Sequence, residues 1–426
     1  MTDQMTDQIE LKSSYDVIVI GGGPAGTAAA TFLQRQGHSC LVLEASRFPR
    51  YHVGESLIPH TYGTLDRLGL LPKLRESDFP VKQSVRFVHP SGRSADPFYF
   101  SETIEGARAK TWQVERSEFD AMCAAHAAAC GVQIAMGTRV HEVLFDGGRA
   151  TGVAVRRNGS EPKRVAARVV VDASGRATVI GNQLGLKDSI PSLRKSSIWS
   201  YYRGAYRQPG IDAGETTIFM IEDRGWFWYI PLPDDVVSVG IVASPEYLWH
   251  APADIKDIFQ REVDRAAPLA EWLRSGECVA PVRGIRELAY LNRETVGPGW
   301  VMVGDAAGFL DPIYSSGIFL ALASAELAAE CIDRGLRSND LSPKTLGAFT
   351  EPLWEGVDVI WRLIRAFYEP QFSFRRFVER YPEHRAALID CLVGDVVGKD
   401  MESFLGALAT MTPPPEPLKK KAATAR

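Results

Sequence analysis

Gly21-Gly22-Gly23-Pro24-Ala25-Gly26 lies between two segments of different character. Residues 16–20 are almost continuously apolar, which is typical of a strand buried on both faces. Residues 27–33 are rich in alanine and predict a helix directly after the glycines. This strand–turn–helix order is the context in which a glycine-rich turn binds a dinucleotide.

The residues around this turn have separate tasks in such a site. Gly21 permits the tight turn, Gly23 lets the backbone approach a pyrophosphate, and Gly26 lets the helix pack on the strand. The phosphates are expected at the free N–H groups of the helix N-terminus. A second apolar strand, residues 39–43, ends in Glu44, where an acid is expected to bind the adenosine ribose. The sequence therefore predicts a dinucleotide-binding domain.

Length and composition limit what the rest of the chain can be. At 426 residues the chain is expected to form two or three subdomains. Its hydrophobic content of 45%, charged content of 23% and net charge of −4 are those of a globular protein. The small negative net charge gives no electrostatic reason to expect nucleic acid or an anionic membrane as a partner. No apolar run is long enough to span a bilayer.

The cysteines indicate a reducing compartment. The six cysteines form no CxxC pair and no metal-like spacing with the eight histidines, so we expect reduced thiols and no metal site. Residues 1–14 are polar and acidic, unlike a secretion signal or a transit peptide. We therefore expect a cytoplasmic protein, with no nucleic acid and no membrane as partner.

The order of the motifs favours a flavin over a nicotinamide. A small dehydrogenase completes its nucleotide domain before its substrate domain, whereas strand ends with glycine and acid recur here near residues 172 and 305. Asp305 follows an apolar strand at 300–303 and is suited to bind a ribityl hydroxyl. The apolar helix expected from Gly317 to about residue 331 would direct its first N–H groups at the isoalloxazine ring.

Antiparallel strands interrupt the nucleotide-binding pattern. Residues 216–221, 225–231 and 236–243 predict a meander, which indicates a separate substrate domain. Helical periodicity with many aromatic residues follows from 340 to about 410. The expected division comprises FAD-binding parts at 15–78, 111–190 and 286–335, substrate-domain parts at 79–110 and 191–285, a helical region at 336–412 and a disordered tail at 413–426.

Motifs from three regions together carry a resemblance to a known superfamily. They are residues 21–26 with Glu44, Val171-Asp172-Ala173-Ser174-Gly175, and Gly304-Asp305-Ala306-Ala307-Gly308. Their order and spacing resemble those of the FAD-dependent enzymes of the para-hydroxybenzoate hydroxylase fold. The resemblance implies an α/β fold in which a Rossmann-like FAD-binding domain is interleaved with an antiparallel β-sheet substrate domain and followed by a C-terminal helical region.

Within that superfamily the chain resembles the flavin-dependent halogenases. Residues 226–231, Trp-Phe-Trp-Tyr-Ile-Pro, fit the WxWxIP signature, and Lys82 stands at the place of the catalytic lysine. Residues 311–317 match the loop before the flavin-facing helix. Trp226 and Trp228 would share one face of a strand, which a packed sheet also favours.

The resemblance implies a reaction and its participants. Reduced FAD from a separate flavin reductase, dioxygen and chloride or bromide give a hypohalous acid. Backbone N–H groups of Ser316 and Gly317, at a helix N-terminus, are the expected halide donors. Trp226 and Trp228 are expected to form a wall that prevents direct oxygen transfer to the substrate. Lys82 is expected to hold the oxidant, as a hydrogen-bond donor or as a transient chloramine.

The resemblance also implies a set of cofactor-binding residues. The turn-rich segment 47–56 is interpreted as a loop that covers the cofactor, whereas Lys73 at a helix end looks structural. The expected cofactor-binding residues are Gly21, Gly23, Ala25, Gly26, Glu44, Arg50, Ser56, Arg116, Asp172, Gly304, Asp305, Gly317 and Ile318.

One departure from the family pattern bears on the substrate. Tryptophan-acting halogenases have an acidic residue where this chain has Tyr314. Without that carboxylate an indole is a poorer substrate, whereas a phenol or a pyrrole is already electron-rich. We therefore expect a small phenolic or pyrrolic substrate, either free or bound to a carrier protein, in antibiotic or other natural-product biosynthesis.

Other functions remain open at this stage. An aromatic hydroxylase of the same fold would reduce its own flavin and would oxidise NADPH without a reductase. Isoprenoid reductases of similar pattern tend to have glycines where Ser315 and Ser316 stand, and their pocket does not need Lys82. A flavin-binding protein without turnover would share the binding motifs. Halogenated product from reduced FAD, dioxygen, halide and a phenol distinguishes these functions.

Overall fold

The computed structural model describes residues 5–6, 9–94, 96–157, 161–222, 225–250 and 252–418. Its first sheet has a central run of five parallel strands in the spatial order β8-β3-β2-β11-β21, and the short strand β1 (Met5–Thr6) adds in parallel beside β8. The five strands are β2 (Ser14–Ile20), β3 (Cys40–Leu43), β8 (Gln133–Ala135), β11 (Lys163–Asp172) and β21 (Trp300–Met302). Along the chain this order is 3-2-1-4-5, the Rossmann order, whose crevice opens where the order reverses. The crevice therefore lies between the ends of β2 and β11.

Strand β2 is apolar throughout its second half because both of its faces are covered. Val17 and Val19 pack among the residues of α1 (Pro24–Arg35), α4 (Arg116–Ala129) and α9 (Ser316–Ser338). Ile18 and Ile20 pack on the opposite face, against β9 (Thr138–Asp146) and β10 (Arg149–Arg157). The predicted strand and helix are confirmed, although α1 begins earlier than expected, at Pro24, since proline fits the first turn of a helix.

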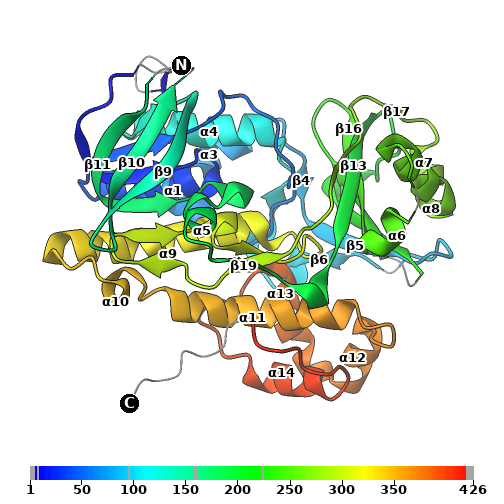
Figure 1. Cartoon of the computed structure of the whole chain (residues 1–426). Helices are drawn as coiled ribbons and strands as arrows, with labels where there is room; N and C mark the ends of the chain where they lie inside the picture. The colour runs from blue at the N-terminus through cyan, green and yellow to red at the C-terminus, as the bar shows by residue number, and fades with distance from the viewer. Residues whose placement is uncertain are drawn as a thin grey trace.

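The second sheet is antiparallel apart from one pair and lies on the other side of the molecule (Figure 1). Its order is β17-β13-β16-β15-β14-β5-β6, with β18 also paired to β13. The predicted meander is confirmed as β14 (Thr216–Ile221), β15 (Gly225–Pro231) and β16 (Val236–Ala243). The other strands are β5 (Ser84–Val88), β6 (Phe98–Tyr99), β13 (Ser196–Arg203), β17 (Glu277–Cys278) and β18 (Arg283–Ile285).

The side chains on the two faces of β15 pack into different hydrophobic cores. Trp226, Trp228 and Ile230 face the C-terminal helical region. Phe227 and Tyr229 face α7 (Ile255–Arg265) and α8 (Ala267–Leu273), as the period-two alternation of a strand requires. The substrate sheet is thus packed on both sides, with its tryptophans on the side of the C-terminal helices.

The C-terminal helices lie beneath both sheets (Figure 1). They are α11 (Thr350–Phe367), α12 (Phe374–Arg380), α13 (Arg385–Val393) and α14 (Glu402–Ala409). Residues 413–418, expected to be disordered, contact this region: Trp361 Nε1 donates to the Glu416 carbonyl at 3.1 Å, and Leu418 packs against the same core. The remainder of the expected tail, 419–426, lies outside the described residues.

Shorter elements connect these layers. The helices are α2 (Thr61–Leu68), α3 (Leu71–Arg75), α5 (Val179–Gln183), α6 (Pro245–Leu248) and α10 (Pro343–Leu346). The strands are β1 (Met5–Thr6), β4 (Val81–Lys82), β7 (Thr111–Trp112), β12 (Lys187–Ser189), β19 (Tyr290–Asn292), β20 (Val296–Gly297) and β22 (Gly308–Phe309). Strands β4 and β7 form a two-stranded ribbon that carries Lys82.

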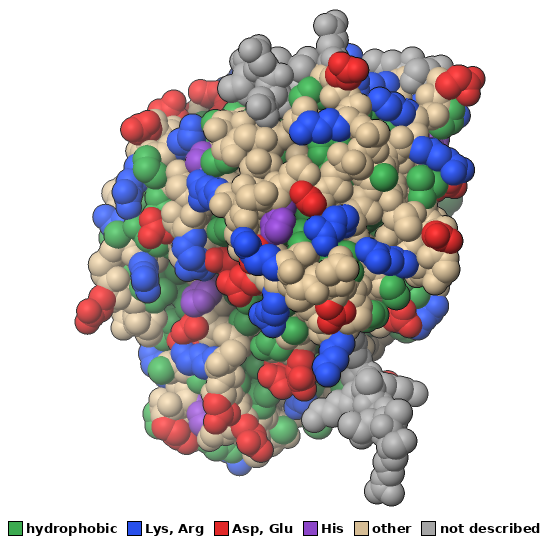
Figure 2. Space-filling view, turned by 90° about the vertical axis from the view of Figure 1, so that its left-hand side faces the viewer, with side chains coloured by type: hydrophobic (Ala, Val, Ile, Leu, Met, Phe, Trp, Pro, Cys, Tyr) green, Lys and Arg blue, Asp and Glu red, His purple; other side chains and the backbone are tan. Residues whose placement is uncertain are grey.

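The surface and the helices have ordinary properties for a globular protein. Figure 2 shows basic and acidic side chains interspersed over the face that it presents. Within the described ranges, no helix has both the length and the apolar character needed to cross a membrane. The same ranges contain no cluster of histidine, cysteine, aspartate and glutamate suited to hold a metal ion.

The tight packing of Trp228 yields a stability prediction. A Cβ atom added at Gly240 would lie 2.3 Å from Trp228 Cζ2, so Gly240→Ala should lower the free energy of unfolding by about 1–3 kcal/mol through overpacking. Gly406→Ala is the matched control, because nothing lies within 4 Å of its added Cβ and alanine favours the helix by up to about 1 kcal/mol. Urea unfolding of both variants measures the difference, and equal stabilities would contradict the packing described here.

Candidate active site

A cleft of about 390 Å³ opens at the carboxyl ends of β2 and β11, where the strand order reverses. Pockets of this size hold small molecules and cofactors. Of the residues predicted to bind the cofactor, those that line the cleft are Gly21, Gly23, Ala25, Glu44, Arg50, Arg116, Asp305, Gly317 and Ile318. They come from segments far apart in the sequence, which the Rossmann order of the sheet brings to one edge.

The glycine turn forms a cradle that side chains would fill. Gly21 has φ +102°, and a Cβ there would lie 2.4 Å from the Ala173 carbonyl oxygen at the end of β11. A Cβ at Gly26 would lie 2.0 Å from the Gly21 carbonyl oxygen. The Glu44 carboxylate accepts hydrogen bonds from the N–H groups of Gly22, at 2.9 Å, and Ser46, at 2.8 Å. A backbone cradle with an acid beside it fits the phosphates and the ribose of FAD.

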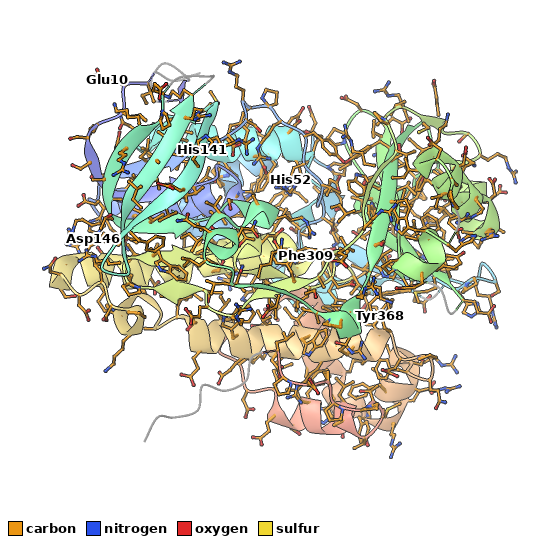
Figure 3. All side chains as sticks on the ribbon, viewed as in Figure 1. Glu10, His52, His141, Asp146, Phe309 and Tyr368 are labelled. Carbon is orange, nitrogen blue, oxygen red and sulfur yellow. The ribbon has the colours of Figure 1, made fainter. Side chains whose placement is uncertain are left out.

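Two arginines hold the covering loop against this cleft. Arg116 Nη1 donates to the carbonyls of Val53, at 2.9 Å, and Gly54, at 3.2 Å. Asp120 pairs with both Arg116, at 2.9 Å, and Arg50, at 3.1 Å, which fixes the loop to α4. His52 also lines the cleft, and its exposed side chain lies between the two sheets (Figure 3).

The other predicted cofactor-binding residues stand behind the cleft. Asp172 accepts hydrogen bonds from the Ser174 hydroxyl, at 2.6 Å, and the Ile180 N–H, at 2.7 Å, so it braces the turn after β11. Gly26 packs under the glycine turn. Gly304 and Ser316 line an adjoining cavity of about 50 Å³, which shares Asp305 and Gly317 with the cleft.

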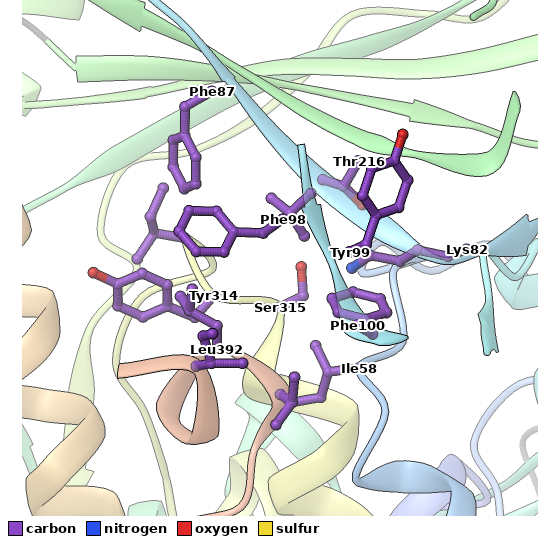
Figure 4. Close-up of a pocket in the computed structure, with 14 residues that line it drawn as sticks. Ile58, Lys82, Phe87, Phe98, Tyr99, Phe100, Thr216, Tyr314, Ser315 and Leu392 are labelled. Carbon is purple, nitrogen blue, oxygen red and sulfur yellow. The ribbon is translucent and has the colours of Figure 1, made fainter. Parts of the chain in front are cut away.

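A separate cavity contains the predicted catalytic lysine. It measures about 20 Å³, room for about one water molecule, and lies between β5, β6, β14 and helix α13. Its walls are mainly apolar and aromatic, with Phe87, Phe98, Tyr99 and Phe100 on one side and Ile389, Leu392 and Val393 of α13 on the other. Figure 4 shows the Lys82 amine pointing toward the middle of this cavity.

Lys82 is fully buried and has only neutral neighbours. Its Nζ donates to Ser56 Oγ at 2.8 Å and to the Leu57 carbonyl at 3.2 Å, and lies 5.6 Å from the Phe100 ring centre. No acidic side chain forms a salt bridge with it among the described residues. Because burial disfavours the charged amine, the pKa of Lys82 is lowered to about 7. The Ser56 hydroxyl, predicted to bind the cofactor, faces this amine and is absent from the cleft lining.

Two chain segments connect the cleft with the lysine cavity. Val53 and Gly54 line the cleft, whereas Ile58, shortly after them, lines the cavity. Likewise Gly317 lines the cleft and Ser315 lines the cavity. Ser315 has a left-handed conformation, with φ 55°, directly before α9. No role at this cavity was predicted for Ser315 from the sequence. Its position directly before the helix expected to face the flavin is the feature that could have pointed to it.

The two predicted tryptophans are anchored behind these cavities and line neither of them. Trp226 Nε1 donates to the Tyr368 hydroxyl at 2.9 Å, and that hydroxyl donates to Asp311 at 2.9 Å. Trp228 Nε1 donates to Ser238 Oγ at 3.0 Å. The carboxyl group of Asp311 is buried, which raises its pKa to about 6. Tyr368 and Asp311 were not predicted as partners of the tryptophans, because the contact joins segments distant in sequence.

Tyr314 fills the position at which an acid was considered. Its hydroxyl donates to the Leu363 carbonyl at 3.1 Å, and its ring lines the lysine cavity. The Tyr314 ring, in the loop before α9, therefore forms part of the cavity wall, while its hydroxyl is hydrogen-bonded to α11.

Comparisons with known proteins agree with this geometry. Residues 14–253 match the family model of the FAD binding domain. A 1H-pyrrole-2-carbonyl-[peptidyl-carrier protein] chlorinase of Pseudomonas fluorescens is 30% identical over 410 residues, covering 91% of each chain. The structure of flavin-dependent brominase Bmp2 superposes with a TM-score of 0.83 at 28% identity, covering 93% of this chain and 97% of that one. The myxobacterial chondrochloren halogenase CndH gives a TM-score of 0.80 at 29% identity, covering 94% and 96%.

The glycine cradle yields a test that separates binding from folding. A Cβ at Gly23 meets only Arg50 Nη2, at 3.6 Å, so Gly23→Ala should change the free energy of unfolding of the apoprotein by no more than about 0.5 kcal/mol. The same Cβ enters the space where a pyrophosphate must approach, and FAD affinity should fall at least about tenfold.

Gly21→Ala is the contrasting variant, because its φ of +102° and the contact with Ala173 should destabilise the apoprotein itself. Thermal melting and FAD titration measure the two effects. Unchanged FAD affinity in Gly23→Ala would contradict the placement of the pyrophosphate.

Proposed function

Since the chain belongs to the flavin-dependent halogenases, whose cofactor is FAD, we propose that it transfers halogen from a hypohalous acid, held by Lys82, to an electron-rich aromatic substrate. The single observation that carries this proposal is the placement of Lys82. A fully buried amine without a counter-ion among the described residues projects into an aromatic cavity that adjoins the cofactor cleft.

Residues of the cleft would hold FAD, which, when bound and reduced, supplies the oxidising chemistry that turns chloride or bromide and dioxygen into hypohalous acid. Gly21, Gly23 and Ala25 would bind the pyrophosphate, Glu44 the adenosine ribose and Asp305 the ribityl chain. The first N–H groups of α9, at Ser316 and Gly317, have no acceptor within the helix, and we propose them as the halide donors. We also propose that a separate reductase supplies the reduced cofactor.

The hydrogen bonds of Lys82 favour one of its two expected roles. Its amine already donates to Ser56 and to the Leu57 carbonyl. A chloramine nitrogen keeps a single hydrogen and would lose one of these bonds, whereas an ammonium group keeps both and has a third hydrogen for the cavity. We therefore propose that Lys82 acts as a hydrogen-bond and proton donor to the oxidant. Trp226 and Trp228 line neither the cleft nor the lysine cavity, so the wall expected of them has no support in this geometry.

The cavity favours an uncharged aromatic substrate. With room for only about one water molecule, the cavity must widen to admit a ring; its aromatic walls and Tyr314 would then pack against a flat ring, and its lining contains no carboxylate to balance the positive charge that develops on a halogenated indole. The Pseudomonas chlorinase acts on a pyrrole bound to a peptidyl-carrier protein. We propose a phenolic or pyrrolic substrate, free or carrier-bound, in natural-product biosynthesis. The six unpaired cysteines agree with the cytoplasmic location that we propose.

Removing the Lys82 amine should stop halogen transfer while leaving cofactor binding intact. In Lys82→Met, halogenation should fall by at least about a hundredfold, because the oxidant loses its donor. FAD binding should be unchanged, since Lys82 does not line the cleft. Lys73→Met, at an exposed position of α3, is the matched control and should behave as the wild type. Mass spectrometry with a panel of phenols and pyrroles measures halogenated product, and full activity in Lys82→Met would refute the proposal.

The same substitution should stabilise the fold, with a defined dependence on pH. The pKa of Lys82 is about 7 in the folded chain and about 10.4 in a model peptide, so between these values the unfolded chain binds more protons. The resulting destabilisation is complete below pH 7 and decreases as pH rises toward 10.4. Lys82→Met removes it, which corresponds to a few kcal/mol, about 1.4 per pKa unit.

Urea unfolding at pH 6 and pH 9 checks this sign. The gain of Lys82→Met over the wild type should be larger at pH 6 than at pH 9, and equal gains at the two pH values would mean that Lys82 is not desolvated.

A further inference from the structure

A chain of three side chains links Lys82 to the wall of its cavity. Lys82 Nζ donates to Ser56 Oγ at 2.8 Å, and Ser56 Oγ lies 3.0 Å from Thr216 Oγ1. Gln113 Nε2 donates to Thr216 Oγ1 at 2.8 Å and to the Gly214 carbonyl at 2.9 Å. Thr216 lines the cavity beside Lys82, whereas Ser56 and Gln113 do not (Figure 4).

The number of available hydrogens indicates which group donates in each of these hydrogen bonds. Both hydrogens of Gln113 Nε2 are used, one on Gly214 and one on Thr216. If Ser56 donates to Thr216, then Thr216 Oγ1 accepts twice and its own hydrogen is left for the cavity. If Thr216 donates instead, Ser56 accepts twice, and its hydrogen is left buried without an acceptor among the described residues. Each arrangement leaves one hydroxyl hydrogen without an acceptor among the described residues. The first is favoured because Thr216 lines the cavity, where a bound molecule can accept its hydrogen, whereas Ser56 does not line the cavity.

Lys82 contributes a second hydrogen to the same space. Two of the three hydrogens of its ammonium form are taken by Ser56 and by the Leu57 carbonyl. The third faces the cavity, toward which the amine points in Figure 4. The cavity measures about 20 Å³, which accommodates one oxygen atom between two donors and does not accommodate an aromatic ring without rearrangement.

We propose that Thr216 is a second donor to the oxidant: its hydroxyl, directed by Gln113 and Ser56, and the Lys82 ammonium together bind the oxygen of hypohalous acid. This inference rests on the proposed function and adds a catalytic residue to it. The two donors fix the oxygen, so that the halogen atom points toward the ring of the entering substrate.

The proposed step balances in atoms and charge. The aromatic carbon forms a bond to the halogen as the oxygen–halogen bond breaks, and the oxygen leaves as hydroxide. Lys82 gives its proton to that hydroxide, which becomes water, while Thr216 stabilises the developing negative charge through its hydrogen bond. The neutral amine then accepts the proton that the ring loses, which restores the ammonium group.

Gln113 has an arrangement that supports a directing task. Its Oε1 is buried and has no donor among the described residues. A buried amide oxygen without a donor lowers the stability of the fold. The position of Gln113 is therefore not explained by good hydrogen bonding at both ends of its amide. Its NH₂ group, in contrast, is fully used: one hydrogen bonds the Gly214 carbonyl and the other the Thr216 hydroxyl.

The test compares two neighbouring threonines of β14. Thr216→Val removes the hydroxyl but keeps the shape, and halogenation should fall by about a hundredfold, as for the loss of one oxyanion donor. Thr216→Ser keeps the hydroxyl and should restore most of the rate. Thr217→Val makes the same change at the next position, where the hydroxyl donates to Glu215 at 3.2 Å on the other face of the strand, and should leave the rate unchanged.

Several outcomes would overturn the inference. They are a wild-type rate in Thr216→Val, or equal losses in Thr216→Ser and Thr216→Val. If Thr216→Val does not fold, as judged by its melting temperature, Gln113→Met leaves Thr216 in place and should still lower the rate through lost orientation. A wild-type rate in that variant contradicts the directing chain. Full activity in Lys82→Met would instead refute the proposed function itself, so the two failures are distinguishable.

A crystal structure provides a readout that does not depend on activity. At high resolution the wild type should show a single ordered water within hydrogen-bond distance of both Lys82 Nζ and Thr216 Oγ1. The same water should be absent or displaced in Thr216→Val. A wild-type cavity without a water bonded to both atoms would contradict the two-donor site.

Discussion

The burial of the Lys82 amine, with no counter-ion in the described part of the chain, is the constraint on which the site depends. An isolated charge in an apolar interior is strongly disfavoured, so the chain must surround Lys82 with dipoles that compensate only in part. The Ser56 hydroxyl and the Leu57 carbonyl provide that compensation. They stand at the end of, and directly after, the loop whose residues 50–54 line the cofactor cleft. The lysine is therefore held by the same segment that runs from the cofactor cleft to the lysine cavity.

The Rossmann strand order explains why these compartments are adjacent. Because β2 lies between β3 and β11, the glycine turn and the turn after β11 meet at one edge of the sheet. Helix α9 begins at that edge, with Ser315 on the cavity side and Gly317 on the cleft side. In the proposed reaction, hypohalous acid formed at the cleft would reach Lys82 along these segments, while the buried tryptophans of β15 remain in the packed core.

Much of this arrangement was predictable from the sequence, and the rest was not for physical reasons. The glycine turn, Glu44 and the meander have local signals, since turn chemistry and strand periodicity are encoded by neighbouring residues. The importance of Lys82 was predicted from a resemblance, but its burial depends on β5, β6 and α13 coming together. The partners Thr216 and Gln113 carry no local signal at all, because a single threonine in a strand has the same pattern whichever way its hydroxyl is directed. Asp172 was expected to touch the cofactor, yet its oxygens are used within its own turn.

Helix α13 covers the lysine cavity with Ile389, Leu392 and Val393, none of which belongs to either sheet. The cavity roof is therefore encoded in a stretch of the gene separate from the catalytic and cofactor-binding segments. Substitutions at these three positions would therefore change the shape of the cavity without touching a residue that lines the cofactor cleft. The part of the chain that would determine which rings enter is thus separate in sequence from the part that would hold the cofactor.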